Sequence, residues 1–274
     1  MFPEPLDALT SDLLQAALEA ARAAEAVLRE APASGVETKV SPTDMVSDAD
    51  RRAEAEASRV LASLRPDDGI LAEEGTARPG SSGVRWVLDP LDGTTNFLFG
   101  VPQFSVSVAA EVDGRAVVGV VADPSRAETW VAAAGHGAFV NGRRCRAAAG
   151  RSTLETALVA TGFGYRRERR SWQASVLSTV LPAVRDIRRL GSAALDLCWT
   201  GGGRFDAYYE WGLNPWDFAA GALIASEAGA RVEVLGERLV VAADPALFDD
   251  FAALLEEAGA LRAPPGPEPA AWES

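Results

Sequence analysis

Stretches of helical periodicity alternate along this chain with short apolar runs, and this alternation limits the folds open to it more than any other feature. Apolar residues recur at three- and four-residue spacing over Leu6–Glu30 and again over Ser47–Pro66, which predicts two amphipathic helices. The pairs Asp113-Gly114 and Asn141-Gly142 are favoured hairpin turns, so we expect an antiparallel meander of strands over residues 103–140. Together these patterns predict a layered α/β protein.

The rest of the chain continues the alternation without an internal repeat. Helices are expected over residues 172–184, 193–200, 215–228 and 245–258, and strands over residues 84–88, 205–210, 232–235 and 238–242. We expect residues 1–262 to form a single domain, with an N-terminal half of about residues 1–145 and a C-terminal half of about residues 146–262. The Pro-rich segment 263–274 is expected to be a flexible tail.

The composition excludes several classes of function. The 274 residues carry 39 acidic and 26 basic side chains, a formal net charge of −13, which argues against a nucleic-acid-binding surface. Two cysteines, Cys145 and Cys198, are too few for a disulfide framework, and no apolar stretch approaches the roughly 18 residues of a membrane span. We therefore expect a cytoplasmic protein. A single histidine, His136, excludes sites built on a histidine pair, so the chemistry is left to carboxylates.

The most unusual segment is Asp89-Pro-Leu-Asp92-Gly-Thr-Thr-Asn96, which follows a predicted strand. It places two carboxylates three residues apart, and the small residues after them can start a helix whose free amides favour an anion such as phosphate. Two more acidic segments are Glu73-Glu74 and Asn214-Pro-Trp-Asp217. These acids can converge only where their repulsion is cancelled, and hard divalent cations such as Mg²⁺ do so with oxygen ligands alone.

Each acidic segment also has a purely structural interpretation. Asn214 to Asp217 is typical of a helix start with a proline at the first helical position, and Ser47 to Asp50 resembles a capping box. Glu73-Glu74 is typical of a solvated loop. Only the Asp89–Asn96 segment makes poor sense for stability alone, because two acids beside a Gly-Thr-Thr turn gain little without a ligand.

Two long motifs carry a resemblance to a known family. Asp89-Pro-Leu-Asp-Gly-Thr-Thr-Asn-Phe97 and Trp216-Asp-Phe-Ala-Ala-Gly221 resemble the paired signatures of the inositol monophosphatase family. Further matches fall in the expected order and spacing, at Lys39–Asp50, Leu71–Gly75, Gly191–Ala194 and Asp206–Glu210. The resemblance covers about residues 6–260. It implies an α-β-α-β-α sandwich of the inositol monophosphatase and fructose-1,6-bisphosphatase type, a homodimer and inhibition by Li⁺.

The implied activity is Mg²⁺-dependent hydrolysis of a phosphomonoester, myo-inositol 1-phosphate, by in-line attack of water without a covalent phosphoenzyme. Carried onto this chain, the resemblance assigns Glu73, Asp89 and the Leu91 carbonyl oxygen to a first ion. Asp89 would also hold a second ion with Asp92 and Asp217, and a third, weaker ion would share Glu73. These two to three ions would activate the attacking water and stabilise the leaving alkoxide.

The same resemblance places a water-activating pair beside these ions. Thr94, paired with Asp50, would orient the attacking water or accept its proton, and Glu74 would hold the same water indirectly. The phosphate would bind to the backbone amides of Gly93, Thr94 and Thr95.

On the leaving-group side the resemblance assigns Ser192, Ala193 and Glu210 to the hydroxyls of the sugar alcohol. A carboxylate such as Glu210 accepts from vicinal hydroxyls, although an exposed strand end is an equally good interpretation of that residue. The chain departs from the family pattern at Gly75, where many members have serine, and at the basic run Arg166–Arg170. That run is expected to be a solvated helix start or loop, or to meet an acidic partner or a more highly charged substrate.

Several alternatives remain open. The substrate could be histidinol phosphate or another small phosphomonoester, and a regulatory or scaffold protein could retain the same fold without depending on hydrolysis. Cys145–Arg151 matches the C-x5-R pattern of cysteine phosphatases, but three alanines replace the glycine-rich loop that this chemistry needs. Aspartyl-phosphate phosphatases use D-x-D-G-T where this chain has D-x-x-D-G-T, which disfavours Asp89 as a nucleophile.

Overall fold

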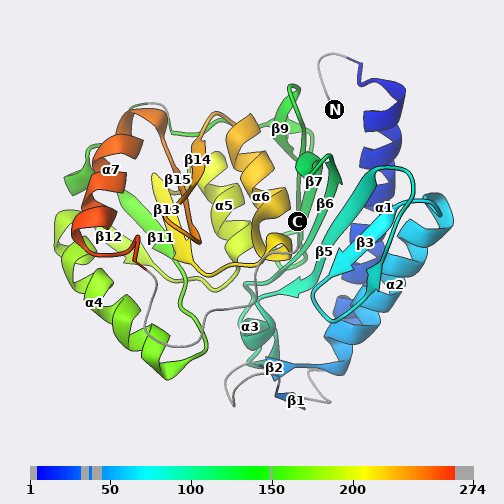
Figure 1. The fold of residues 1–274 in the computed structure, drawn as a ribbon, viewed down its shortest axis with the longest axis horizontal. Coiled ribbons are helices and arrows are strands. Elements are labelled where there is room, and N and C mark those ends of the chain that lie inside the picture. The colour runs from blue at the N-terminus through cyan, green and yellow to red at the C-terminus, as the bar shows by residue number, and fades with distance from the viewer. Residues whose placement is uncertain (1–4, 32–36, 39–44, 149, 151, 263–274) are drawn as a thin grey trace.

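A computed structural model describes residues 5–31, 37–38, 45–148, 150 and 152–262. Over these residues the chain forms two large β-sheets and seven α-helices. They stack in the order helix pair, eight-stranded sheet, helix pair, five-stranded sheet, helix pair (Figure 1). The α-β-α-β-α prediction is therefore confirmed.

The first layer consists of the two helices predicted at the start of the chain, α1 (Ala8–Glu30) and α2 (Asp48–Leu64). Asp7 caps α1 by accepting a hydrogen bond from the backbone of Thr10, and Ser47 forms the predicted capping box with Asp50. Many buried residues of both helices are alanines. Their small side chains let the two helices approach each other and the sheet beneath them closely.

The eight-stranded sheet contains the predicted meander. Its strands are β3 (Gly69–Ala72), β4 (Ala77–Arg78), β5 (Val84–Asp92), β6 (Ser105–Val112), β7 (Arg115–Asp123), β8 (Glu128–Ala133), β9 (Gly137–Val140) and β10 (Arg143–Arg144), in the order β10-β9-β8-β7-β6-β5-β3-β4. Asp113 and Gly114 both have positive φ, as do Asn141 and Gly142, which confirms these pairs as tight hairpin turns. Strand β3 was not predicted, and it pairs in parallel with β5.

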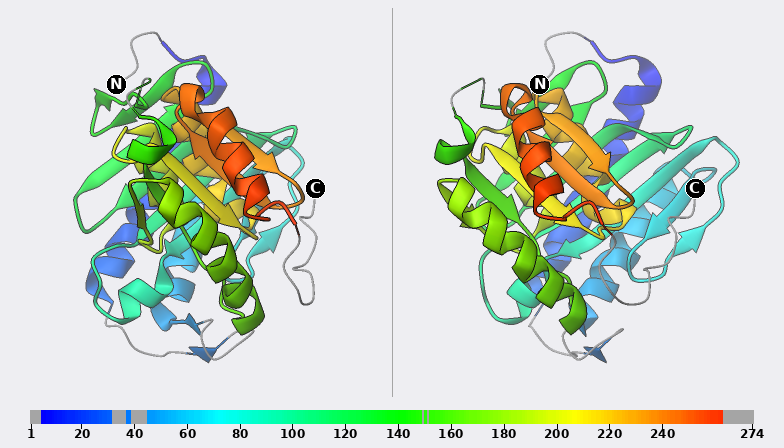
Figure 2. Two further views of the ribbon diagram at one scale, coloured as in Figure 1. Left: turned by 90° about the vertical axis from the view of Figure 1, so that its left-hand side faces the viewer. Right: turned by 60° about the vertical axis from the view of Figure 1, so that its left-hand side comes forward.

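The five-stranded sheet is mixed. It consists of β11 (Leu158–Thr161), β12 (Asp186–Arg188), β13 (Ala207–Trp211), β14 (Arg231–Leu235) and β15 (Leu239–Ala243), in the order β12-β11-β13-β15-β14. Helices α5 (Ala193–Gly201) and α6 (Pro215–Glu227) lie between the two sheets, and α4 (Arg167–Ala183) and α7 (Pro245–Glu257) cover the outer face (Figures 1 and 2). Helix α4 begins at Arg167 rather than at Trp172, so the basic run forms its first turn.

Successive side chains of a strand point to opposite faces of its sheet and pack into different apolar cores. Each core lies between two neighbouring layers. On β6, Val108 packs toward α1 and α2, whereas Ala109 packs toward α5 and α6. On β15, Val240 faces the middle helices and Val241 faces the outer ones. Because neighbouring residues point to opposite faces, both sheets are buried on both sides and read as nearly continuous apolar runs.

Four short elements complete the description: the paired strands β1 (Glu37–Thr38) and β2 (Met45–Val46), the helix α3 (Thr94–Leu98) and a 3-10 turn at Leu154–Thr156. Among the described residues, none of the helices combines the length and apolar character that crossing a membrane requires. Residues 39–44 of the family motif and the predicted tail 263–274 lie outside the described residues. The division into halves near residue 145 stays a prediction.

Candidate active site

One pocket of about 450 Å³ lies where strand ends of both sheets meet the starts of the middle helices. The predicted site residues that line it are Glu73, Asp89, Leu91, Asp92, Gly93, Thr94, Ala193, Glu210 and Asp217. They come from the ends of β3, β5 and β13 and from the starts of α3, α5 and α6. The fold therefore brings together acids that are far apart in the sequence.

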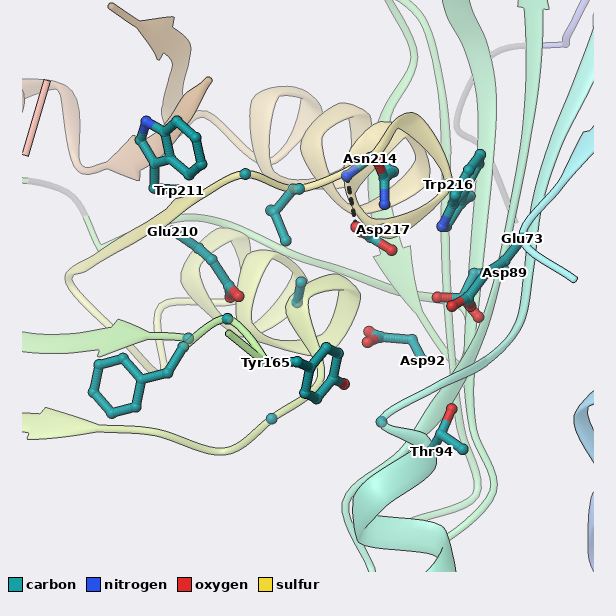
Figure 3. Close-up of a pocket in the computed structure, with 18 of the residues that line it drawn as sticks. Glu73, Asp89, Asp92, Thr94, Tyr165, Glu210, Trp211, Asn214, Trp216 and Asp217 are labelled. Atoms are coloured by element: carbon teal, nitrogen blue, oxygen red, sulfur yellow. Dashed lines mark hydrogen bonds between the residues drawn. The ribbon is translucent and has the colours of Figure 1, made fainter. Parts of the chain in front are cut away.

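Five carboxylates line this pocket, and four of them are the predicted metal ligands. Figure 3 shows those of Glu73 and Asp89 side by side, with Asp92 and Asp217 directed into the same space. Burial raises the pKa of Asp89 well above its ordinary value, and the charges of Glu73, Asp92 and Asp217 raise it further. Burial and the charge of Glu73 likewise raise the pKa of Asp217. Burial and the neighbouring charges thus both disfavour the ionised forms of Asp89 and Asp217, and a bound cation would offset that cost.

Hydrogen bonds from the backbone fix one oxygen of each aspartate. Asp92 Oδ2 accepts from Ala194 N at 2.8 Å, Asp217 Oδ2 from Asn214 N at 2.6 Å, and Asp89 Oδ1 from Leu91 N at 2.9 Å. Burial raises the pKa of Asp92 to about 6, and its hydrogen bonds offset part of that rise. Asn214 and Asp217 form a capping box at the start of α6. Asp217 therefore both caps this helix and lines the pocket.

The chemistry of this donor set fits a hard divalent cation. Within the part of the chain that the structure describes, Asp89, Asp92 and Asp217 make no ion pair with a basic side chain, although all three line one pocket. Oxygen-only ligands of this kind are what Mg²⁺ prefers. No three His, Cys, Asp or Glu side chains among the described residues stand in an arrangement that could hold a metal ion as they are. The assignment of individual ligands stays a prediction.

Asp50 lies directly beneath the pocket. The Thr94 hydroxyl donates to Asp50 Oδ1 at 2.9 Å and lies 3.1 Å from the Leu91 carbonyl oxygen. Asp50 itself is fully buried and accepts from the backbone N and the hydroxyl of Ser47. Since the hydroxyl proton of Thr94 is directed at these acceptors, its oxygen is left to accept a hydrogen bond from a water molecule in the pocket.

The remaining predicted residues do not line the pocket. Ser192 is fully buried at the start of α5, and its hydroxyl donates to Asp92 Oδ2 at 2.7 Å, so it positions an acid of the pocket. Its contact with a substrate stays a prediction. Thr95 is half-buried on α3. Glu74 is also half-buried, in the loop after β3.

Sequence reasoning missed Glu54, which holds this loop. Its carboxylate is almost completely buried on α2 and accepts from Glu74 N at 2.6 Å and from Thr76 N at 2.9 Å. These bonds fix the loop that carries Glu73. The sequence did contain a signal for a buried Glu54, because this residue is one helical turn from Asp50 on the face that also buries Ala53 and Ala57.

Glu210 lines the pocket wall opposite these acids and is not an exposed strand end. Burial raises the pKa of its carboxyl to about 7, although a 2.9 Å hydrogen bond from the Tyr208 hydroxyl and the charge of Arg189 counteract part of the rise. A Cβ atom at Gly162 would lie 1.8 Å from this carboxylate, so a larger residue there would require the Glu210 side chain to move.

The raised pKa of Glu210 predicts a stability change with pH. Its folded value of about 7 exceeds the ordinary value of 4.5, so the folded protein binds more protons between these pH values, and stability falls as pH rises through them. We expect Glu210→Gln to raise the unfolding free energy of the metal-free protein at pH 8 by roughly 2 kcal/mol, with little change at pH 4.5. Thermal unfolding at both pH values measures this, and a variant less stable than wild type at pH 8 would contradict it.

The described part of the cysteine phosphatase pattern does not fit that chemistry. Cys145 is buried, and burial raises the pKa of its thiol to about 11, so a reactive thiolate is not formed at neutral pH. Arg151, the other end of that pattern, lies outside the described residues.

Comparison with known proteins decides the family. The sequence profile of the inositol monophosphatase family matches residues 9–260. This chain belongs to the inositol monophosphatase family. The inositol-1-monophosphatase SuhB of Mycobacterium tuberculosis is 48% identical to it over 241 residues, which span 82% of this chain and 83% of that protein.

Two further relatives of this inositol monophosphatase family member differ in name. The Nus factor SuhB of Pasteurella multocida is 42% identical over 229 residues, covering 80% of this chain and 84% of that one. The solved structure of a Thermotoga maritima IMPase superposes with a TM-score of 0.82 at 31% identity, covering 91% of this chain and 98% of that one. The family and fold predictions are confirmed, and the relatives that are similar in sequence carry two kinds of name.

Proposed function

We propose that this protein is a Mg²⁺-dependent phosphomonoesterase that hydrolyses inositol 1-phosphate to inositol and phosphate. The observation that carries the proposal is the convergence of Glu73, Asp89, Asp92 and Asp217 in one pocket beside Thr94. Membership of the family supports the reaction class. The name of the Mycobacterium tuberculosis relative supports the substrate.

The acids of this pocket are the proposed ligands of two to three Mg²⁺ ions. Glu73, Asp89 and the Leu91 carbonyl oxygen would hold one ion, and Asp89, Asp92 and Asp217 another, with Glu73 shared by a third. When bound, Mg²⁺ supplies positive charge that lowers the pKa of the attacking water and stabilises the phosphoryl group and the leaving oxygen. The hydrogen bonds to Asp89, Asp92 and Asp217 hold these side chains for that task.

The protein's own groups then set the direction of attack. Thr94 accepts a hydrogen bond from the water, Asp50 holds the Thr94 hydroxyl, and Glu74 assists from the loop after β3. The backbone amides of Gly93, Thr94 and Thr95 are proposed to bind phosphate oxygens. Glu210 and Ala193 are proposed to meet the hydroxyls of the leaving group. Figure 3 shows Thr94 and Glu210 on different sides of Asp92, which supports attack by water on one side and binding of the leaving group on the other.

A steady-state assay of the purified protein tests this proposal. We expect Mg²⁺-dependent release of phosphate from inositol 1-phosphate, with histidinol phosphate and glycerol 2-phosphate as comparison substrates and EDTA as the metal-free control. Faster turnover of histidinol phosphate than of inositol 1-phosphate would move the assignment to another phosphomonoester. A cytoplasmic location, a homodimer, inhibition by Li⁺ and the absence of nucleic-acid binding stay predictions.

The second candidate is a regulatory protein that does not depend on hydrolysis. The observation that favours it is the name of the Pasteurella multocida relative, a Nus factor. The completeness of the acidic pocket favours the enzyme. Failure to release phosphate from any of the three esters at millimolar Mg²⁺ would leave the regulatory function as the better account.

A further inference from the structure

A buried arginine outside the pocket lining holds the segment that leads into α6. Arg238 lies in the turn between β14 and β15 and is almost completely buried. Its Nη2 atom donates to the Leu213 carbonyl oxygen at 2.9 Å and to Asn214 Oδ1 at 3.3 Å. Its own carbonyl oxygen accepts from Gly212 N at 3.0 Å. One residue of the β14–β15 hairpin therefore contacts three consecutive residues of another segment.

That segment joins two walls of the pocket. It runs from the end of β13, which carries Glu210, to the start of α6, which carries Asp217. Gly212 has φ +86°, a conformation that other residues rarely adopt, and the chain bends there. Because this bend belongs to no helix or strand, its shape depends on contacts with other segments, and the hydrogen bonds of Arg238 supply such contacts.

Asn214, the last residue of the segment, connects this support to Asp217. Asn214 N donates to Asp217 Oδ2 at 2.6 Å, the dashed line in Figure 3, and Arg238 holds the side chain of the same asparagine. Because this hydrogen bond fixes one carboxylate oxygen, the position of Asn214 helps to determine where the other oxygen lies in the pocket. A change at Arg238 would therefore be transmitted to a proposed metal ligand.

Arg238 also adds positive charge on the Asp217 side of a pocket that five carboxylates line. Burial lowers the pKa of the Arg238 guanidinium, and the charge of Asp217 acts in the opposite direction, so the two groups attract each other. A guanidinium stays protonated in proteins, so this attraction adds to the hydrogen bonds in keeping Asp217 near its position.

We propose that Arg238 is a positioning residue for the metal site: by fixing Leu213 and Asn214 it presents Asp217 to the ion, and it thereby sets the affinity of the site. The inference rests on the proposed function and adds a residue that acts through Asn214. Residues that support a metal ligand from behind commonly contribute about 10- to 100-fold in metal affinity. The rigid, planar guanidinium fixes the directions of its hydrogen bonds, which the flexible ammonium group of lysine does less well.

Calorimetric titration of the metal-free protein with Mn²⁺, which shares the oxygen-ligand preference of Mg²⁺, tests the inference. We expect Arg238→Met, which keeps most of the apolar stem, to raise the dissociation constant for Mn²⁺ by about tenfold or more, and Arg238→Lys to raise it by less. The Mg²⁺ concentration needed for half-maximal release of phosphate from inositol 1-phosphate should rise by a similar factor. At saturating Mg²⁺, kcat should stay within severalfold of wild type, because the bound ion restores the position of Asp217. Thermal unfolding verifies that each variant folds.

Two controls separate the positioning of Asp217 from other effects. Arg231→Met removes the same charge from the same hairpin, where Arg231 makes ion pairs with Glu233 and Asp249 outside the pocket lining. We expect this control to bind Mn²⁺ within about twofold of wild type, because salt screens charges at the surface. In an Asp217→Asn background, Arg238→Met should weaken Mn²⁺ binding by less than about twofold more, because the residue through which it acts is already changed.

The outcomes distinguish the inference from the function on which it rests. Wild-type affinity for Mn²⁺ in a folded Arg238→Met variant would overturn the inference and leave the phosphatase intact. Equal weakening by Arg238→Met and Arg231→Met would assign the effect to net charge, and an undiminished effect in the Asp217→Asn background would assign it to another ligand, both against the inference. If Arg238→Met does not fold, wild-type affinity in Arg238→Lys would overturn it. A wild-type protein that neither binds Mn²⁺ nor releases phosphate would overturn the proposed function and this inference together.

Discussion

Asp92→Asn is expected to lower kcat by about 100-fold or more. The substitution removes one negative charge from the proposed ligand set, and a bound metal contributes several kcal/mol to transition-state stabilisation, at about 1.4 kcal/mol for each tenfold in rate. An asparagine oxygen can still accept the hydrogen bonds from Ser192 and Ala194, so the local structure should persist. Steady-state kinetics over a Mg²⁺ titration measures the loss.

The same variant is expected to be more stable than wild type in the absence of metal. Asp92 lies among like charges and its pKa is raised to about 6, so its ionised form destabilises the folded protein at neutral pH. Asp123→Asn is the matched control, because Asp123 is a buried aspartate that makes an ion pair with Arg126 at 2.9 Å, away from the pocket. We expect that control to lose stability and keep its turnover. The opposite pattern in the two variants would contradict the assignment of Asp92.

Asp50→Asn is expected to lower kcat by about 100-fold while leaving the Mg²⁺ concentration needed for half-maximal activity unchanged. Asp50 touches Thr94 and not the pocket, so its loss weakens the positioning of the water without removing a proposed ligand. The effect falls on kcat because the contact matters when water attacks. A variant with wild-type kcat would show that Thr94 acts without Asp50.

Ser47→Ala controls for the second role of Asp50. Both residues belong to the capping box of α2, so either substitution is expected to reduce stability by about 1 kcal/mol. Only Asp50→Asn changes the group that holds the Thr94 hydroxyl. We therefore expect Ser47→Ala to lose stability while its kcat stays within severalfold of wild type. A 100-fold loss in this variant as well would mean that the start of α2, and not the carboxylate, determines turnover.

Local patterns in the sequence predicted most of the helices and strands, but not all of the residues at which they begin and end. The helices over Ala8–Glu30 and Asp48–Leu64 follow from apolar spacing and capping residues, which act within a few residues. Strand β3 has only four residues, too few for a periodic signal, and its pairing with β5 depends on the fold. The early start of α4 was missed because charged residues such as Arg167 and Glu168 give no apolar stripe.

The site was predictable to the extent that motifs in the sequence matched a family. Spacing alone indicated acids at a strand end, and the resemblance was needed to join Asp89 with Asp217. The structure adds the residues that support the site through packing and hydrogen bonds. Ser192 supports Asp92 from below, and Glu54 fixes the loop of Glu73.

The central claim is that magnesium binds where these acids converge, and diffraction from crystals soaked in Mn²⁺ tests it most directly. Anomalous scattering locates Mn²⁺, which shares the oxygen-ligand preference of Mg²⁺. The account predicts peaks in contact with Asp89 and with Glu73, Asp92 or Asp217, which weaken in Asp92→Asn crystals. Peaks confined to other parts of the molecule, in a protein that still hydrolyses phosphomonoesters, would contradict it.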